Sequence, residues 1–453
     1  DRLLDSPRHG ERQATLWLDL VRYADSDGYK SDHYRPEAWR YRDYVIRSFN
    51  TDKPYDRFVR EQLAGDEIDP GNRDALIATM FLRHWIYEYN QRDVETQWSD
   101  ILADVTNVTA DVLLGMGLQC ARCHDHKFDP IPQRDYYRMQ AFFEPLLPRD
   151  SMPVGTVAQR TKFFELHKAW AAATEDIRRQ LHAIEKPALL KSTTGEVFNK
   201  FIDKIKTMIL KRPEQRTVYE RQIAELSERQ FGVEPEKLAG RLKGGAKADW
   251  ERLRAELKTF EAQKPKPLPQ VKFVVSDAGP VAPATRLPKQ GDAVEPGFLS
   301  ILDPGSARIT PPPAALQSTG RRTALANWIT RPDNPLTSRV MVNRLWQQHF
   351  GRGLAANASD FGKLGEPPTH PALLDWLAAR FVADGWSLKK MHRLMVTSAA
   401  YRQASANASS EQADPANTWF ARAPISRLSA EQVRDGLLAV SGELDLESGG
   451  EGV

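Results

Sequence analysis

Residues 112–124 read Val-Leu-Leu-Gly-Met-Gly-Leu-Gln-Cys-Ala-Arg-Cys-His, a largely apolar helix end that runs directly into a Cys-x-x-Cys-His motif. The protein has only two cysteines, and both are in this motif. If two cysteines and ten histidines were scattered along 453 residues, this arrangement would arise in roughly one chain in ten thousand. We therefore interpret Cys120, Cys123 and His124 as one functional unit in a helical setting.

This unit has the spacing of a covalent haem attachment site. Two thiols can add to the two vinyl groups of a porphyrin, and the histidine that follows can ligate the iron. The motif therefore predicts one haem c, with Cys120 and Cys123 as thioether anchors and His124 as the proximal axial ligand. We expect the apolar run 112–118 to form a wall of the haem pocket and the polar residues after His124 to form its rim.

Four side chains are candidates for the sixth iron ligand. They are Met139, His84, Met152 and His33. A methionine would raise the reduction potential, a histidine would lower it, and an empty position would admit a small ligand. We exclude His126, because its short tether to His124 does not let it reach the opposite face of the same haem.

Three other interpretations of the motif stay open. A structural zinc site could use both cysteines with His124 or His126, but a distant His or Asp would have to complete it. A Cys-x-x-Cys redox pair lacks the strand expected before it, because a helical pattern precedes the motif. The third interpretation is a structural disulfide.

Polar and aromatic residues are also concentrated between positions 25 and 42. The group contains Asp27, His33, Arg35, Trp39, Arg40 and Arg42. A salt-bridged loop is the simplest interpretation. Alternatively, the three arginines and the tryptophan could contact the haem propionates, or Asp27, His33, Arg40 and Arg42 could line a pocket for a sugar or an anion. Further along, a weaker candidate for a second site contains Asn343, Arg344, Trp346, His349, His370 and His392.

Hydrophobic periodicity predicts a mainly α-helical fold in four segments. Residues 1–150 are expected to form a helical haem domain and residues 151–263 a helical hairpin or coiled coil. Residues 264–318 form a proline-rich extended connector with a small strand at 271–275, and residues 319–453 a second helical domain. The apolar positions of the hairpin are Ile177, Leu181, Ile184, Tyr219, Ile223, Leu226, Trp250, Leu253, Leu257 and Phe260. A chain of this length allows two or three domains, each with its own core.

Composition excludes some classes of protein. Lys and Arg number 63 against 60 Asp and Glu, so net charge gives no support to nucleic acid binding. No stretch approaches the run of about 18 apolar residues that a membrane span requires. The chain begins Asp-Arg-Leu-Leu, without the pattern of a signal peptide, and we expect any export signal to lie outside this chain.

Several short stretches resemble those of a known family. In the first part of the chain they are Arg-Tyr-Ala-Asp-Ser-Asp-Gly (22–28), Trp-Arg-Tyr-Arg-Asp-Tyr-Val (39–45), Asp-Lys-Pro-Tyr-Asp-Arg-Phe (52–58) and 120–130. In the last part they are Asn-Arg-Leu-Trp (343–346), Gly-Arg-Gly-Leu (351–354), Asp-Phe-Gly (360–362) and His-Pro (370–371). They resemble the first and second modules of the planctomycete cytochrome c-associated proteins, whose two modules have unknown function. The resemblance implies a secreted or periplasmic redox protein and carries over only Cys120, Cys123 and His124.

We therefore expect an extracytoplasmic c-type cytochrome-like protein that binds one haem, transfers electrons and meets a redox partner protein. Two alternatives stay open. One is a secreted or periplasmic enzyme that acts on a polymer such as polysaccharide, and the other is a surface scaffold. Neither a nucleic acid partner nor a membrane span is expected, and the sequence does not indicate the oligomeric state.

Overall fold

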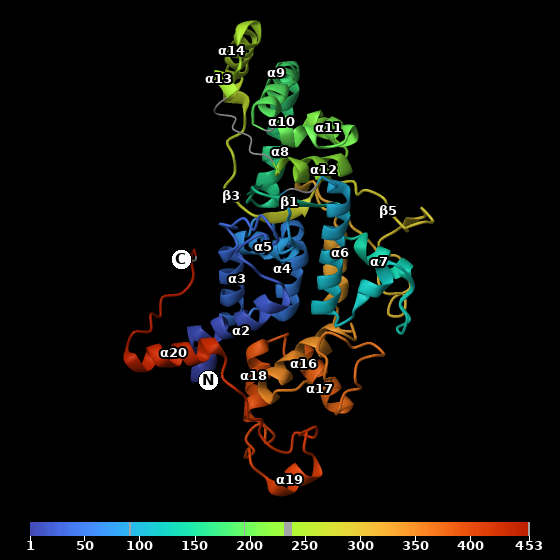
Figure 1. The fold of residues 1–453 in the computed structure, drawn as a ribbon, viewed down its shortest axis with the longest axis vertical. Helices are drawn as coiled ribbons and strands as arrows, with labels where there is room; N and C mark the ends of the chain where they lie inside the picture. Colours follow the sequence, from blue (N-terminus) through green and yellow to red (C-terminus); the bar gives the residue numbers. More distant parts are fainter. Residues whose placement is uncertain (90–91, 194, 231–237, 452–453) are drawn as a thin grey trace.

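Figure 1 shows the computed structural model of the chain, which describes all residues except 90–91, 194, 231–237 and 452–453. Helices make up 54% of it and strands 5%, so the predicted mainly α-helical fold is confirmed. The strands that it describes are short and pair in twos.

The elements follow the chain in three groups. The first group contains α1 (Arg2–Asp5), α2 (Pro7–Leu20), α3 (Trp39–Asn50), α4 (Tyr55–Ile68), α5 (Arg73–Ala78), η1 (Thr79–Arg83), α6 (Val94–Leu113), η2 (Leu118–Arg122), α7 (Gln133–Gln140), β1 (Leu146–Arg149) and β2 (Met152–Pro153). The second contains α8 (Val157–Ala173), α9 (Glu175–Thr193), α10 (Gly195–Asn199), α11 (Asp203–Leu210), η3 (Pro213–Gln215), α12 (Val218–Glu228), α13 (Leu238–Arg241), α14 (Gly244–Lys258) and η5 (Glu261–Gln263). The third contains β3 (Gln270–Val271), β4 (Val274–Asp277), β5 (Thr285–Arg286), β6 (Ala293–Val294), η6 (Ala314–Leu316), α15 (Arg321–Ile329), α16 (Thr337–Phe350), α17 (Pro371–Ala383), α18 (Leu388–Thr397), α19 (Ala408–Ala413) and α20 (Ala430–Ser441).

Aromatic side chains hold α2, α3 and α4 together. The indole N–H of Trp17 donates to the hydroxyl of Tyr41 at 3.1 Å, and its ring meets that of Phe58 edge to face at 5.0 Å. Gly10 lets α2 approach α3 closely, because a Cβ at this position would lie 2.4 Å from the carbonyl oxygen of Ile46. These contacts form the base on which the rest of the N-terminal segment packs.

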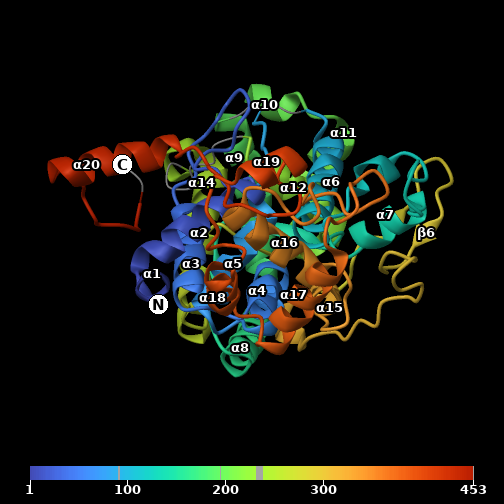
Figure 2. The ribbon, with the colours of Figure 1, turned by 90° about the horizontal axis from the view of Figure 1, so that it is seen from below.

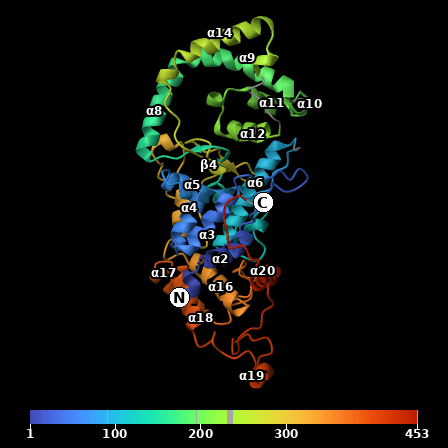
Figure 3. The same ribbon diagram turned by 90° about the vertical axis from the view of Figure 1, so that its left-hand side faces the viewer.

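The middle segment forms an arch of α8, α9 and α14 that lies beyond the main body (Figure 3). Two of the three predicted apolar groups meet there, since Ile177 and Leu181 of α9 pack with Leu253 of α14. The third group does not join them. Ile223 and Leu226 of α12 are part of the main core, where α12 packs against α6.

The connector between the helical segments returns to the N-terminal segment. Its β4 pairs antiparallel with β1, and its β3 pairs with β2. The strand predicted at 271–275 is therefore two short strands, interrupted at Phe273, whose φ is +60°. The Phe273 ring lies 3.9 Å from the guanidinium of the buried Arg83, and this cation–π contact holds the bend in place.

One continuous hydrophobic core runs through both helical segments. It extends from Ala14 and Trp17 in α2 to Phe381 in α17 and Phe420 near the C-terminal end. The two helical segments therefore share one core. The connector belongs to it as well, because its Val274 and Val275 are buried in the same core.

A buried ionic cluster joins the same three parts of the chain. Arg322 of α15 is fully buried and donates to both carboxylate oxygens of Asp66 at 2.7 Å and to Asp277 of β4 at 3.0 Å. Glu67 lies 3.3 Å from the same guanidinium. Since an unpaired charge in such a place is costly, these groups fix the position of α15 against α4 and β4.

The C-terminal helices α16, α17 and α18 lie at one end of the N-terminal segment, next to α2 (Figures 1 and 3). The Tyr55 backbone N–H donates to the Trp386 carbonyl at 3.0 Å, and the Lys389 backbone N–H donates to Asp52 at 3.0 Å. Within the described part of the chain, no helix is long and apolar enough to cross a bilayer.

Candidate haem site

The Cys-x-x-Cys-His motif lies on a single turn of 3-10 helix, η2, and the loop that follows it. Leu118 and Ala121 point into the core and anchor this turn, whereas Cys120 and Cys123 are exposed. The Cys123 backbone N–H donates to the Cys120 carbonyl at 3.4 Å, so the two cysteines follow one another around the same turn. Both thiols are free and on the surface.

The turn is fastened to α6 and α7 through Arg122. Its guanidinium pairs with Asp100 of α6 at 2.9 Å. Its backbone carbonyl accepts hydrogen bonds from the Gln133 side chain and the Tyr137 hydroxyl of α7, both at 3.0 Å. Arg122 therefore fixes the position of the turn that carries the two cysteines.

His124 is exposed, and its ring is oriented by the backbone. Its Nδ1 lies 2.6 Å from the carbonyl oxygen of Asp125, a contact that requires the proton on Nδ1. Nε2 is then the nitrogen with a free lone pair, and this is the state in which an imidazole ligates a metal. The geometry of His124 fits the role of an axial ligand.

His126 has a different role, because its ring braces the loop. The Asp129 backbone N–H donates to His126 Nδ1 at 3.0 Å, and the His126 backbone N–H donates to the Ile131 carbonyl at 2.9 Å. The Asp125 carboxylate accepts from the Gln133 backbone N–H at 2.8 Å. These bonds close residues 125–133 into a compact loop beside His124.

The loop of the C-terminal segment at 360–363 clamps the motif from the other side. The Lys363 backbone N–H donates to the Asp129 carboxylate at 2.6 Å, and the Phe361 N–H donates to the Gly115 carbonyl at 2.8 Å. Gly115 has a φ of +61°, and a Cβ there would lie 2.8 Å from Val340. We call these contacts the interdomain clamp.

The clamp gives a stability prediction. Gly115→Ala is expected to lower the free energy of unfolding by about 2–4 kcal/mol, because it adds left-handed backbone strain and a clash with Val340. Gly117→Ala is the matched control: no other heavy atom lies within 4 Å of its Cβ, and its φ is −72°. Chemical denaturation should show a change below about 0.5 kcal/mol for the control. Equal effects of the two substitutions would contradict the clamp.

A hollow of about 450 Å³ is formed by the loop that follows His124 and by residues 300–301. Its lining residues are Asp125, His126, Asp129, Pro130, Ile131, Pro132, Ser300 and Ile301, so neither His124 nor the two cysteines line it. The run 112–118 does not supply this wall, contrary to expectation, because Val112, Leu113, Leu114 and Leu118 are buried in the core. Two free thiols on one turn, followed by an imidazole that the backbone orients, are the donor set that a haem c requires, so the residues present fit a haem c.

The alternative interpretations of the motif find less support. In the ranges that the structure describes, no group of three or more His, Cys, Asp or Glu residues is arranged to hold a metal ion. Cys120 and Cys123 are free rather than joined in a disulfide.

The candidate sixth ligands are mostly inside the protein. Met139 of α7 and Met152 of β2 are buried in the core. His84 is buried between the rings of Tyr23 and Tyr41, and burial holds its pKa well below the usual value. His33 is exposed and packs on Tyr89. Ligation by Met139 or His84 would therefore require them to leave the core.

The predicted propionate contacts lie elsewhere. Arg35 is buried and pairs with Asp27 at 2.6 Å. Arg40 pairs with Glu37 and lies 4.3 Å from the Trp39 ring, while Arg42 pairs with the neighbouring Asp43 at 3.0 Å. Helix α3, which carries Trp39, Arg40 and Arg42, and helix α7, which packs on the motif, are on opposite sides of α6 (Figures 1 and 2). The structure does not bring these cations and the motif together.

Three histidines meet at the contact between the helical segments. His349 Nε2 of α16 lies 2.8 Å from His392 Nδ1 of α18, and the His392 ring meets the His9 ring of α2 at 5.4 Å. The sequence singled out His349 and His392 but not His9. No spacing pattern connects His9 to the other two, because it comes from the opposite end of the chain.

Residues 1–147 match PSCyt2, a protein of unknown function (DUF1549), and residues 321–453 match PSD1, a protein of unknown function (DUF1553). The chain carries both domains. No curated protein and no solved structure matches it. The Cys-x-x-Cys-His motif is thus in the PSCyt2 domain, and the 360–363 side of the interdomain clamp comes from the PSD1 domain.

Proposed function

We propose that this protein holds one covalently attached haem c at Cys120, Cys123 and His124 and transfers electrons outside the cytoplasm. One observation carries the proposal: two free, exposed thiols lie on one turn, followed by an exposed imidazole whose Nδ1 is turned toward a carbonyl. The names of the matched domains point to cytochrome c-associated proteins and agree with it.

Each residue of the site has a distinct task in this proposal. Cys120 and Cys123 form the thioether bonds, and His124 presents Nε2 to the iron while the Asp125 carbonyl orients its ring. Arg122 and the interdomain clamp hold the loop still. A haem c, when bound, supplies a one-electron couple.

The exposed position of the motif favours electron transfer over chemistry in a closed pocket. Cys120, Cys123 and His124 all lie at the surface, where a redox partner protein can approach. Transient redox encounters use small interfaces, so a short loop on a rigid helical base is sufficient. Periplasmic or extracellular localisation follows from the family resemblance.

The proposal predicts how cysteine variants behave when the protein is exported together with haem-maturation machinery. The Cys120→Ala, Cys123→Ala double variant should lose all haem staining on a denaturing gel, because both thioether bonds are gone. Gln119→Ala, which changes the exposed neighbour of Cys120, should stain like the unmodified protein. Staining that survives the double substitution, or that is absent from the unmodified protein, would contradict the proposal.

An absorption spectrum distinguishes electron transfer from the enzyme alternative. Two strong axial ligands support electron transfer, whereas a high-spin iron that binds cyanide readily supports an enzyme with an open iron position. Because Met139 and His84 are in the core, neither is placed to provide the second strong ligand without movement.

A further inference from the structure

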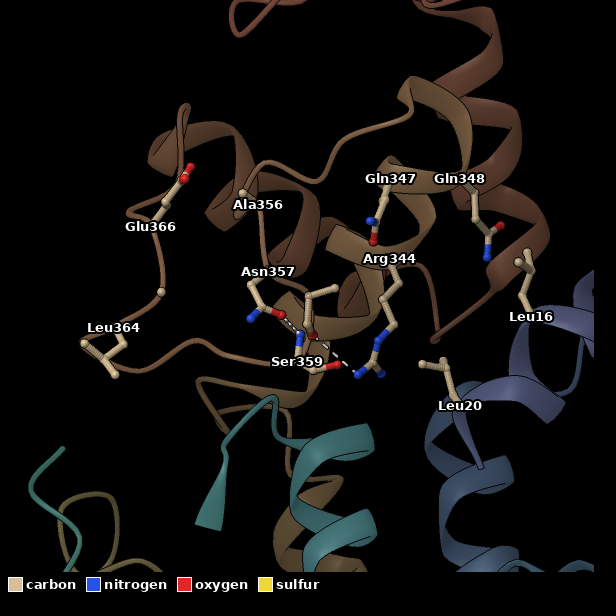
Figure 4. Close-up of a pocket in the computed structure, with 12 residues that line it drawn as sticks. Leu16, Leu20, Arg344, Gln347, Gln348, Ala356, Asn357, Ser359, Leu364 and Glu366 are labelled. Carbon is tan, nitrogen blue, oxygen red and sulfur yellow. Dashed lines mark hydrogen bonds between the residues drawn. The ribbon is translucent and has the colours of Figure 1, made fainter. Parts of the chain in front are cut away.

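The largest cavity among those described lies where α2 meets the PSD1 domain (Figure 4). Its volume is about 830 Å³, within the usual range for ligand sites. Leu16 and Leu20 come from α2 and Gln347 and Gln348 from α16, and the loop 356–366 completes the wall. This cavity shares no lining residue with the hollow formed by the loop that follows His124.

The charged groups of the cavity already have partners within the protein. Arg344 is 6% exposed and donates to the carbonyl groups of Asp111 and Val112 at the C-terminal end of α6. The partial negative charge of that helix end offsets the guanidinium. On the opposite side, Glu366 pairs with Arg352 at 2.6 Å. The terminal nitrogens of Arg344 and the Glu366 carboxylate are therefore both engaged within the protein.

Amide and hydroxyl groups make up the rest of the polar wall. Figure 4 shows Gln347, Asn357 and Ser359 around one space, with Leu16 and Leu20 on one side and Leu364 on the other. Asn357 uses its carbonyl oxygen to accept from the Ser359 backbone N–H at 3.0 Å, which leaves its NH₂ group available. In the described part of the chain, the amides of Gln347 and Gln348 bond to no protein group.

We propose that this cavity binds a neutral saccharide. Each sugar hydroxyl both donates and accepts a hydrogen bond, and amide side chains offer one group of each kind. The C–H faces of a sugar ring can lie against Leu16, Leu20 and Leu364. An anionic sugar fits less well, because the two terminal nitrogens of Arg344 already donate to backbone carbonyls.

One loop connects the proposed saccharide site with the Cys-x-x-Cys-His motif. The loop 356–366 lines the cavity at both ends, and its central residues Phe361 and Lys363 form the interdomain clamp. A ligand in the cavity would thus contact the segment that holds the haem motif. The binding proposal does not depend on haem attachment and can be tested on its own.

The test uses the full chain on an array of immobilised glycans. The neutral set contains α- and β-linked glucans, mannans, galactans and xylans, and the acidic set contains polyuronates and sulfated galactans. We expect binding to at least one neutral glycan. Gln347→Leu, which removes the amide but keeps an apolar side chain of similar size, should weaken that binding about tenfold.

A blocking variant and a matched control complete the experiment. Ser359→Trp fills the cavity from an exposed position and should abolish binding, whereas Ser409→Trp on α19, also exposed and away from the cavity, should leave it unchanged. Binding to no glycan, binding to the acidic set alone, or binding that Ser359→Trp leaves intact would each overturn the proposal. Circular dichroism of all three variants verifies that they fold.

Discussion

Replacing Arg322 with methionine is expected to lower the free energy of unfolding by about 3–5 kcal/mol, or to prevent folding. The substitution leaves Asp66, Glu67 and Asp277 buried together with no cation between them. Arg322 also joins α15 of the PSD1 domain to α4 and β4, so its loss removes a link between three parts of the chain. Chemical denaturation of the full chain measures the effect.

The neighbouring arginine provides the control. Arg321→Met removes a half-buried guanidinium that donates to the Ala141 carbonyl at 2.7 Å and should cost only about 1 kcal/mol. Adding Asp66→Asn to Arg322→Met should restore part of the lost stability, because it removes one of the unpaired charges. If Arg321→Met and Arg322→Met destabilise the protein equally, the buried cluster does not have the role assigned to it.

The second large predicted effect is a loss of folding stability at acidic pH. His392 is 3% exposed, and burial together with His349 and His9 lowers its pKa to about 3. In the unfolded chain its pKa is near 6.5. Below that pH His392 is protonated in the unfolded state but stays neutral in the folded state. This histidine therefore removes stability as the pH falls from about 6.5 to 3, by about 2 kcal/mol at pH 5.

Other groups near these three histidines also influence the pH dependence, and their contributions must be distinguished from that of His392. Lys389 lowers and Asp52 raises the pKa of His9, burial lowers the pKa of His349, and the Tyr401 ring meets the His349 ring edge to face. Elsewhere, burial raises the pKa of Glu67 to about 7, which favours the folded state as the pH falls toward 4.5. A comparison between variants cancels that opposing contribution.

The measurement is the free energy of unfolding at pH 7 and pH 5. His392→Gln should lose about 2 kcal/mol less than the unmodified protein over this interval. His33→Gln, which changes an exposed histidine in the N-terminal segment, is the control. An unchanged pH dependence in His392→Gln would refute the burial of a neutral imidazole at this contact.

Periodicity of apolar residues was sufficient to predict the helical class and the contact of α9 with α14. It could not predict that Ile223 and Leu226 leave the hairpin for the main core, because the same apolar spacing suits either partner. The sequence also did not predict that the two helical segments share one core. Its key charged residues, Arg322, Asp66 and Asp277, come from three distant stretches, and a lone charge in a sequence is normally read as a surface residue.

At the site, too, the sequence predicted local features but not contacts between distant residues. The Cys-x-x-Cys-His spacing identified the cysteines and His124 as one unit, and the structure places them on one turn and the loop that follows it. The apolar run 112–118 was predicted to form a wall of the haem pocket, but its large side chains are in the core. Composition does not distinguish the two, since both environments favour apolar residues. The sequence placed Asp129 at the polar rim of the site but did not predict its bond to Lys363 or the bond of Phe361 to Gly115, because both bonds use a backbone N–H of a distant loop, which leaves no mark on residue type.

Digestion of the exported protein with trypsin tests the central claim most directly. Cleavage after Arg122 cuts between the two cysteines and yields peptides 93–122 and 123–127. We predict that mass spectrometry under reducing conditions finds these two peptides joined in one species that carries the mass of a single haem. Two separate peptides with unmodified thiols would contradict covalent haem attachment, and with it the proposed role in electron transfer.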